Sequence, residues 1–119
     1  MHFERVVHEG SGEIASLAHY EIGWCYYQMG KRREAVSHFQ AYLDRYPDSE
    51  IAPDIHFWFA EYYERQKDYS RSERYLKRLL EKFPSHTLAD EALLRWSSIA
   101  SERKAYPQAI SLLDRLIQD

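Results

Sequence analysis

The feature that most constrains this 119-residue chain is a repeat of 37 residues that recurs without gaps. Residues 50–57 restate residues 13–20 at a shift of 37, and a second shift of 37 reaches residues 87–94. Self-similarity at a fixed period of roughly 20 to 50 residues is the signature of a repeat architecture, in which each unit buries its apolar face against its neighbours. The chain is therefore predicted to stack copies of one structural unit.

Each copy is predicted to contain two helices. Apolar residues within residues 14–29 recur at spacings of three and four, which is the periodicity of a helix and not of a strand. Gly30 is placed for the turn between the two helices, and Pro47 and Pro84 end the second helix of their copies. We expect six helices in three hairpins, over residues 12–29, 32–46, 50–66, 69–83, 87–103 and 106–118.

Both ends of the chain resemble parts of further copies. Residues 2–7 are similar to residues 38–43, so residues 1–10 are predicted to be the remnant second helix of a preceding repeat. The chain stops at Asp119, before the position where another proline is expected. We therefore expect one domain over residues 1–119, taken from a longer array, with a short protein that has frayed ends as the alternative. Its repeats are expected at residues 12–47, 50–84 and 87–119.

Composition excludes several classes of protein. Aromatic residues make up 15% of the chain, whereas Gly and Pro together number 8 (4 and 4), a balance that is unlike that of disordered chains. No apolar run approaches the roughly 20 residues that a membrane-spanning helix needs. The net charge of −3 argues against a general nucleic-acid binder, which requires a basic face. Cys25 is the only cysteine and cannot form an internal disulfide.

The residues of each copy resemble the tetratricopeptide repeat (TPR) family, whose first helix carries a large residue, Leu-Gly and Tyr. After the turn, the family has a small residue, an aromatic residue and a proline. In copy one these positions are Ile22, Gly23, Tyr26, Gly30, Ala35, Phe39 and Pro47. In copy two they are Phe59, Ala60, Tyr63, Tyr69, Ser72, Leu76 and Pro84, and in copy three Trp96, Ser97, Ala100, Tyr106, Ala109 and Leu113. The resemblance implies an all-α solenoid of three helix-turn-helix repeats that forms a right-handed superhelix, with a partial helix at the N-terminus.

The period and the junctions narrow this resemblance. The period of 37 exceeds the usual family period of about 34, which indicates a longer connection after each proline. The junctions at residues 46–49 and 83–86 are similar to those of TPR proteins of the bacterial cell envelope, of the Tol-associated periplasmic and outer-membrane-assembly lipoprotein types. That similarity implies a periplasmic or cell-envelope location, with a cytoplasmic location left open. The resemblance also implies that Cys25 is a buried core thiol.

The resemblance further implies that a partner peptide or helix binds in a concave groove lined by the first helices. The predicted groove residues are Tyr20, Trp24, Tyr27, Asp54, Phe57, Trp58, Glu61, Glu64, Glu91 and Leu94. Tyr20, Trp24 and Tyr27 share one helix face, and Phe57 lies 37 residues after Tyr20, so the rings are expected to be neighbours. They either form an aromatic platform for a partner or pack against adjacent helices. The acidic residues around them favour a partner with apolar and basic character.

Two other functions remain as alternatives. The chain could self-assemble by stacking repeats end to end between copies, and an RNA-binding helical repeat of the pentatricopeptide kind is disfavoured by the absence of a basic groove. The sequence has no Gly-rich phosphate loop, nucleophile elbow or metal motif, so we expect no enzyme, no cofactor and no metal. His19 and His56 share one repeat position, but Leu93 occupies it in the third copy, so both histidines are predicted to serve packing.

Overall fold

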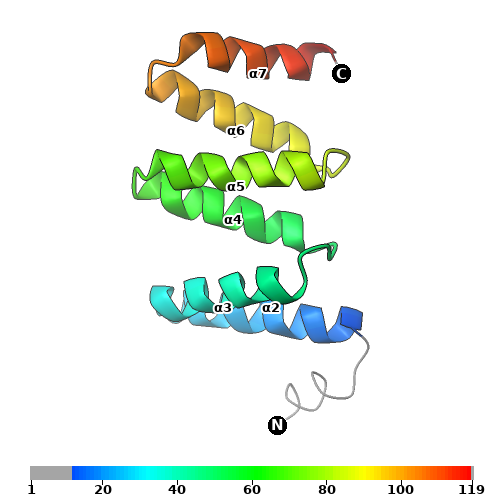
Figure 1. Ribbon diagram of the computed structural model, residues 1–119. Coiled ribbons are helices and arrows are strands. Elements are labelled where there is room, and N and C mark those ends of the chain that lie inside the picture. Colours follow the sequence, from blue (N-terminus) through cyan, green and yellow to red (C-terminus); the bar gives the residue numbers. More distant parts are fainter. Residues whose placement is uncertain (1–11, 119) are drawn as a thin grey trace. The chain divides into compact units, whose positions relative to one another are not determined.

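The structure is a computed structural model that describes residues 12–118. The predicted remnant helix over residues 1–10 lies outside the described residues. The described residues form helices α2 (Gly12–Gln28), α3 (Arg32–Arg45), α4 (Ala52–Arg65), α5 (Tyr69–Lys82), α6 (Leu88–Glu102) and α7 (Tyr106–Gln118) (Figure 1). All six lie within two residues of the predicted bounds, which confirms an all-α helical repeat over this part of the chain. The right-handed superhelix and the single domain stay predictions.

The chain divides into two compact units, residues 1–55 and residues 56–119. In its described part, the first unit contains α2, α3 and the first four residues of α4. The second unit contains the remainder of α4 together with α5, α6 and α7.

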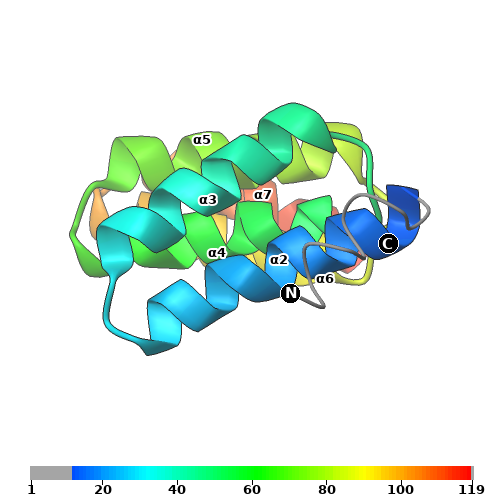
Figure 2. The same ribbon diagram turned by 90° about the horizontal axis from the view of Figure 1, so that it is seen from below.

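In the first unit, α2 and α3 form an antiparallel hairpin (Figure 2). Phe39 lies at the contact between the two helices. Phe39 is fully buried, and a Cβ atom built on Gly23 would lie only 2.5 Å from its Cε1 atom. The ring therefore packs directly on the backbone of α2, where only glycine leaves enough room. The rings of Tyr20 and Trp24 each lie with their centroids 6.0 Å from that of Phe39 and enclose it.

In the second unit, α4 and α5 repeat this hairpin with other residues at the contact. The hydroxyl of Ser72 donates a 2.7 Å hydrogen bond to the carbonyl oxygen of Ala60, so two small residues meet where the helices approach. Leu76, which lies 37 residues after Phe39, is fully buried, and the rings of Phe59 and Tyr75 stack with centroids 4.6 Å apart.

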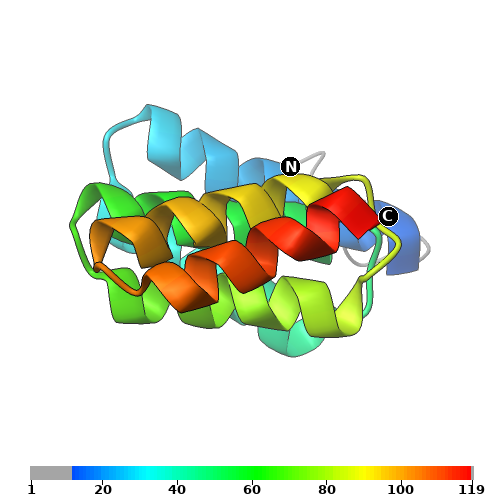
Figure 3. The ribbon, with the colours of Figure 1, turned by 90° about the horizontal axis from the view of Figure 1, so that it is seen from above.

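Helix α6 packs on both α5 and α7. Figure 3 shows α6 and α7 as the antiparallel third hairpin, in yellow to red. Between α5 and α6, Glu73 accepts a 3.1 Å hydrogen bond from Nε1 of Trp96 and forms an ion pair with Arg103. The helical repeat in this unit is thus stabilised by a polar contact in addition to its apolar core.

The turn inside each hairpin has a residue with a positive φ angle at the same position of the repeat. The φ angles of Gly30, Lys67 and Lys104 are 79°, 61° and 62°, and these three positions are 37 residues apart. The following N–H donates to the carbonyl five positions earlier, which closes the helix as in a Schellman motif. These bonds are Lys31 to Tyr26 (2.9 Å), Asp68 to Tyr63 (2.9 Å) and Ala105 to Ala100 (2.7 Å). The prediction of a turn at Gly30 is confirmed, and in the other copies a lysine adopts the same conformation.

Candidate functional site

The aromatic residues predicted to line the groove in the first unit lie together on α2. The ring centroids of Tyr20 and Trp24 are 6.2 Å apart, those of Trp24 and Tyr27 are 5.7 Å apart, and both pairs meet edge to face. All three side chains are half-buried. Because Tyr20 and Trp24 also contact Phe39, the set both packs in the hairpin and presents ring surface to solvent.

An acidic side chain lies near these rings. Asp54 is exposed in the first turn of α4, where a negative charge is favoured by the helix dipole. Burial raises the pKa of the Tyr20 hydroxyl above its usual value, and the negative charge of Asp54 adds to the effect. Tyr20 therefore remains an uncharged phenol at neutral pH.

In the second unit, α4 and α6 enclose a pocket of about 350 Å³ that we call the acidic pocket. It is lined by Phe57, Glu64, Glu91, Leu94, Arg95 and Ser98. Four of these residues, Phe57, Glu64, Glu91 and Leu94, belong to the predicted set, so the structure brings them together within one unit.

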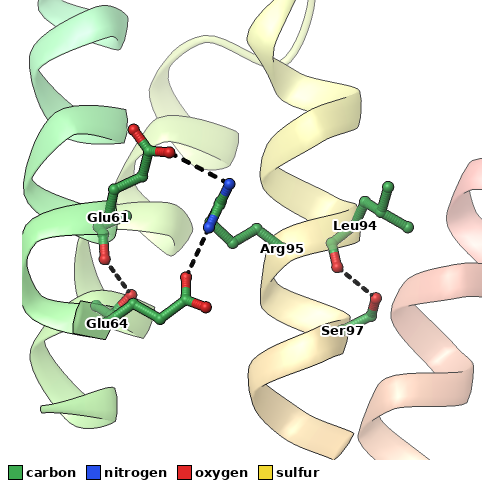
Figure 4. Close-up of polar contacts among 7 residues, drawn as sticks. Glu61, Glu64, Leu94, Arg95 and Ser97 are labelled. Atoms are coloured by element: carbon green, nitrogen blue, oxygen red, sulfur yellow. Dashed lines mark hydrogen bonds and ion pairs between the residues drawn. The ribbon is translucent and has the colours of Figure 1, made fainter. Parts of the chain in front are cut away.

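Arg95 organises the acidic pocket. Its Nη2 atom lies 3.2 Å from Oε2 of Glu61 and its Nη1 atom lies 2.9 Å from Oε1 of Glu64 (Figure 4). The guanidinium carbon also lies 5.3 Å from the centroid of the Phe57 ring, which is a cation–π contact. Arg95 therefore holds two carboxylates of α4 against α6. The sequence pattern could not assign this role, because the paired carboxylates lie 34 and 31 positions earlier in the chain.

Trp58 differs from the prediction that it lines the groove. Its side chain is 8% exposed, and its ring stacks on that of Tyr62 at 5.1 Å and meets Phe59 edge-on at 5.1 Å. Successive residues of a helix point about 100° apart. When the side chain of Phe57 lies in the pocket, that of Trp58 therefore points into the core.

Cys25 also differs from expectation, because its side chain is exposed. Its counterpart in the third copy, Ile99, is buried because α6 packs against both α5 and α7. In the first unit, α3 packs on α2, and Cys25 lies on a face of α2 that is exposed.

The histidines at the shared repeat position pack within their own hairpins, as predicted. The ring centroid of His19 lies 5.6 Å from that of His38 and 5.8 Å from that of Tyr46. Burial lowers the pKa of His19, with smaller contributions from His38 and Arg45, and burial also lowers the pKa of His38. Across residues 12–118, no three His, Cys, Asp or Glu side chains lie close enough together to hold a metal ion.

The second histidine has equivalent neighbours. The ring centroid of His56 lies 5.9 Å from that of Tyr75 and 6.3 Å from that of Phe83, which are the residues 37 positions after His38 and Tyr46. The two units thus use one aromatic arrangement at the same place in the repeat.

Comparison with known proteins agrees with this architecture. Sequence models of the tetratricopeptide repeat match residues 17–49 and residues 53–96. A search of curated proteins found none that matches the chain. None of the helices within the described part of the chain is long and apolar enough to cross a membrane. The matches, the repeated hairpins and the small residues at their contacts lead to one conclusion: the chain belongs to the tetratricopeptide repeat family.

Proposed function

We propose that the chain is a non-enzymatic scaffold that binds a peptide or helix carrying both basic and apolar side chains. Tetratricopeptide repeats generally mediate protein–protein interaction and scaffolding. The observation that supports this partner chemistry is the acidic pocket, which places carboxylates and exposed apolar surface side by side on α4 and α6.

The charge of the pocket favours a cationic partner. Among the lining residues, Glu64 and Glu91 carry two negative charges and Arg95 carries one positive charge, so the net charge of the lining is −1. Glu61, which pairs with Arg95, adds a further negative charge beside the pocket. The guanidinium of Arg95 is engaged with Glu61 and Glu64, whereas Glu91 is exposed at the pocket wall. Leu94 is 55% exposed beside it and offers an apolar contact. A basic side chain next to an apolar one would satisfy both features.

In the first unit, the half-buried rings of Tyr20, Trp24 and Tyr27, with Asp54 nearby, support the same kind of partner. Tyr and Trp are enriched among residues that carry binding energy, because they combine large apolar area with a polar atom. Trp58 is not part of the proposal, since it lies in the core. We also retain membership of the bacterial cell-envelope type as a proposal, supported by the proline junctions at residues 46–49 and 83–86.

The test is a binding titration with designed helical peptides in which Arg and Leu share one face. We expect the labelled Arg/Leu peptide to bind, and we expect binding to weaken with added salt because opposite charges attract less when screened. The substitution Glu91→Gln should weaken binding about fivefold, equal to about 1 kcal/mol, which is typical of an exposed ion pair. Fluorescence anisotropy of the labelled peptide measures both effects.

Two controls define the outcome. Glu81→Gln removes the same charge from an exposed position on α5, outside the pocket, and should leave the affinity unchanged. A peptide with Glu in place of Arg should not bind. Equal affinities for the Arg and Glu peptides, or equal losses from Glu91→Gln and Glu81→Gln, would show that the acidic pocket does not select the partner.

A further inference from the structure

We propose that the exposed side of α5 is a second binding surface, which binds a short acidic segment of a partner protein. Helix α5 lies between α4 and α6 in the chain, so this surface adjoins neither end of the described residues. The proposal is independent of the acidic pocket, which is lined by α4 and α6 and would bind a basic partner.

Five basic side chains share one side of α5, and we call this surface the basic face. All five are exposed: Arg71, Arg74, Lys77, Arg78 and Lys82. At about 100° per residue, they fall within an arc of about 140° around the helix. The centre of the buried side of α5, with Ser72 and Leu79, lies on the opposite side. Because a helix rises about 1.5 Å per residue, the basic face extends roughly 16 Å along α5.

Few carboxylates offset the charge of the basic face. Asp68 lies 3.5 Å from Arg71 in an exposed ion pair, and Glu81 is exposed among the basic side chains. The other acidic residue of α5, Glu73, is directed at α6, where it accepts a hydrogen bond and forms an ion pair. Five positive charges against the two negative charges of Asp68 and Glu81 leave this region with a net charge of +3.

The repeat architecture does not require this charge. The residues 37 positions before the five basic residues have a net charge of zero, and those 37 positions after them have a net charge of −1. The two sets are Glu34, Ser37, Gln40, Ala41 and Arg45, and Gln108, Ser111, Asp114, Arg115 and Asp119. The second helix of the repeat is therefore basic on this side in the second copy only, and packing of the repeat does not explain it.

Two of the guanidinium groups are held in place by aromatic rings. The guanidinium carbon of Arg71 lies 5.5 Å from the centroid of the Tyr63 ring, and that of Arg78 lies 5.6 Å from the centroid of the Tyr75 ring. Such cation–π contacts restrict the side chain but leave N–H groups at the edge of the guanidinium able to donate. Less conformational entropy is therefore lost when a carboxylate binds.

The charge of the remaining chain favours a short protein segment as the occupant. The whole chain has a net charge of −3, so the residues outside this +3 region carry −6. A nucleic acid or an anionic membrane would extend beyond the basic face and meet this negative charge within the screening distance of roughly 8 to 10 Å. An acidic segment of about three helical turns would match the length of the basic face and contact only its cations. Tetratricopeptide repeats also generally mediate protein–protein interaction.

The test is a binding titration of the full chain with a labelled helical peptide that carries Glu on one face, at positions i, i+4, i+7 and i+11. We expect this Glu peptide to bind, with an affinity that falls as salt is added, because screening weakens the attraction between opposite charges. A peptide with Gln in place of each Glu should not bind. Fluorescence anisotropy of the labelled peptides measures both results.

Variants of the chain locate the binding surface. Arg74→Gln combined with Lys77→Gln removes two cations of the basic face and should weaken binding about tenfold, since an exposed ion pair contributes about threefold. Lys31→Gln combined with Arg32→Gln removes one lysine and one arginine from exposed positions at the start of α3 and should leave the affinity unchanged. Glu81→Gln removes a negative charge from among the basic side chains and should strengthen binding about twofold. Circular dichroism should show the same helix content in every variant.

Several results would contradict the proposal. Equal binding of the Glu and Gln peptides, or equal losses from the two double variants, would show that the basic face does not bind carboxylates. Tighter binding of phosphatidylserine vesicles or of single-stranded DNA than of the Glu peptide, at the same salt concentration, would assign the face to another class of anion. The substitution Glu91→Gln in the acidic pocket should leave the affinity for the Glu peptide unchanged, so failure of this proposal is distinct from failure of the acidic pocket to bind its partner.

Discussion

Lowering the pH from 7 to 5 is expected to reduce the free energy of unfolding by about 2 kcal/mol through His56 alone. The imidazole of His56 is buried against the rings of Tyr75 and Phe83. Burial, together with the positive charges of Arg78 and Lys82, lowers the pKa of His56 from 6.5 to about 4. The folded chain therefore resists taking up a proton that the unfolded chain accepts.

The direction of the effect follows from proton binding. Above pH 6.5 the histidine is neutral in both states and contributes no penalty. Between pH 6.5 and about 4, the unfolded state binds more protons than the folded state, so stability falls as the pH falls. Below about pH 4 both states are protonated, and the loss reaches its full value of about 3 kcal/mol.

Urea unfolding at pH 7 and pH 5 measures this loss, and His56→Leu is the matched variant. The third copy already has leucine at this position, as Leu93, which is buried. The lowered pKa values of His19 and His38 act in the same direction, but they are present in both proteins and cancel in the comparison. If the variant and the unmodified chain lost the same free energy between the two pH values, burial of His56 would not be the cause.

The substitution Gly23→Ala is expected to destabilise the first hairpin by about 1 to 2 kcal/mol, although alanine is the better helix former. The added Cβ atom would lie 2.5 Å from Cε1 and 2.8 Å from Cδ1 of Phe39. Phe39 is fully buried and its ring contacts those of Tyr20 and Trp24, so it can move away from α2 only by displacing its neighbours. Overpacking of this kind outweighs the gain of about 1 kcal/mol in helix propensity.

The second copy of the repeat indicates which substitution should relieve the clash that Gly23→Ala creates with Phe39. There the same two positions hold Ala60 and Leu76, which pack without a clash. In a Phe39→Leu background, Gly23→Ala should therefore be neutral or stabilising by up to about 1 kcal/mol. A double-mutant cycle, measured by thermal or urea unfolding, gives the coupling between the two sites.

Gly30→Ala is the control, because Gly30 is needed for its backbone conformation and not for space beside Phe39. No atom lies within 4 Å of a Cβ placed there, but the φ angle of 79° disfavours any side chain. Its cost should be the same with Phe39 or leucine at position 39. Additive costs for Gly23→Ala and Phe39→Leu would show that the ring does not limit position 23.

The helices and turns were predictable because their signals are local. The apolar spacing within residues 14–29 and the positions of Gly30 and Pro47 depend on residues close in sequence, and the 37-residue period extends them to the other copies. The burial of Trp58 was not predictable in this way. Two adjacent aromatic residues, Phe57 and Trp58, satisfy the same pattern, and only packing decides which of them enters the core.

The contacts of the candidate site depend on packing in the same way. Arg95 meets carboxylates on another helix, and no spacing within α6 indicates that pairing. The exposure of Cys25 depends on which face of α2 is covered by packing, which the residue type alone does not reveal. The sequence pattern therefore predicts the repeat unit well and the chemistry between units poorly.

The left-handed lysines in the turns have a consequence for local opening of the hairpins. A residue other than glycine in this conformation costs roughly 1 to 2 kcal/mol, which Lys67 and Lys104 incur and Gly30 does not. That cost is recovered whenever the turn frays, so the second and third hairpins should open more readily at their turns than the first. Hydrogen exchange measures this opening. The amides of Asp68 and Ala105 should exchange faster than that of Lys31 after correction for intrinsic rates. Local opening should then begin more often at the turns of Lys67 and Lys104, which lie one repeat apart, than at the turn of Gly30.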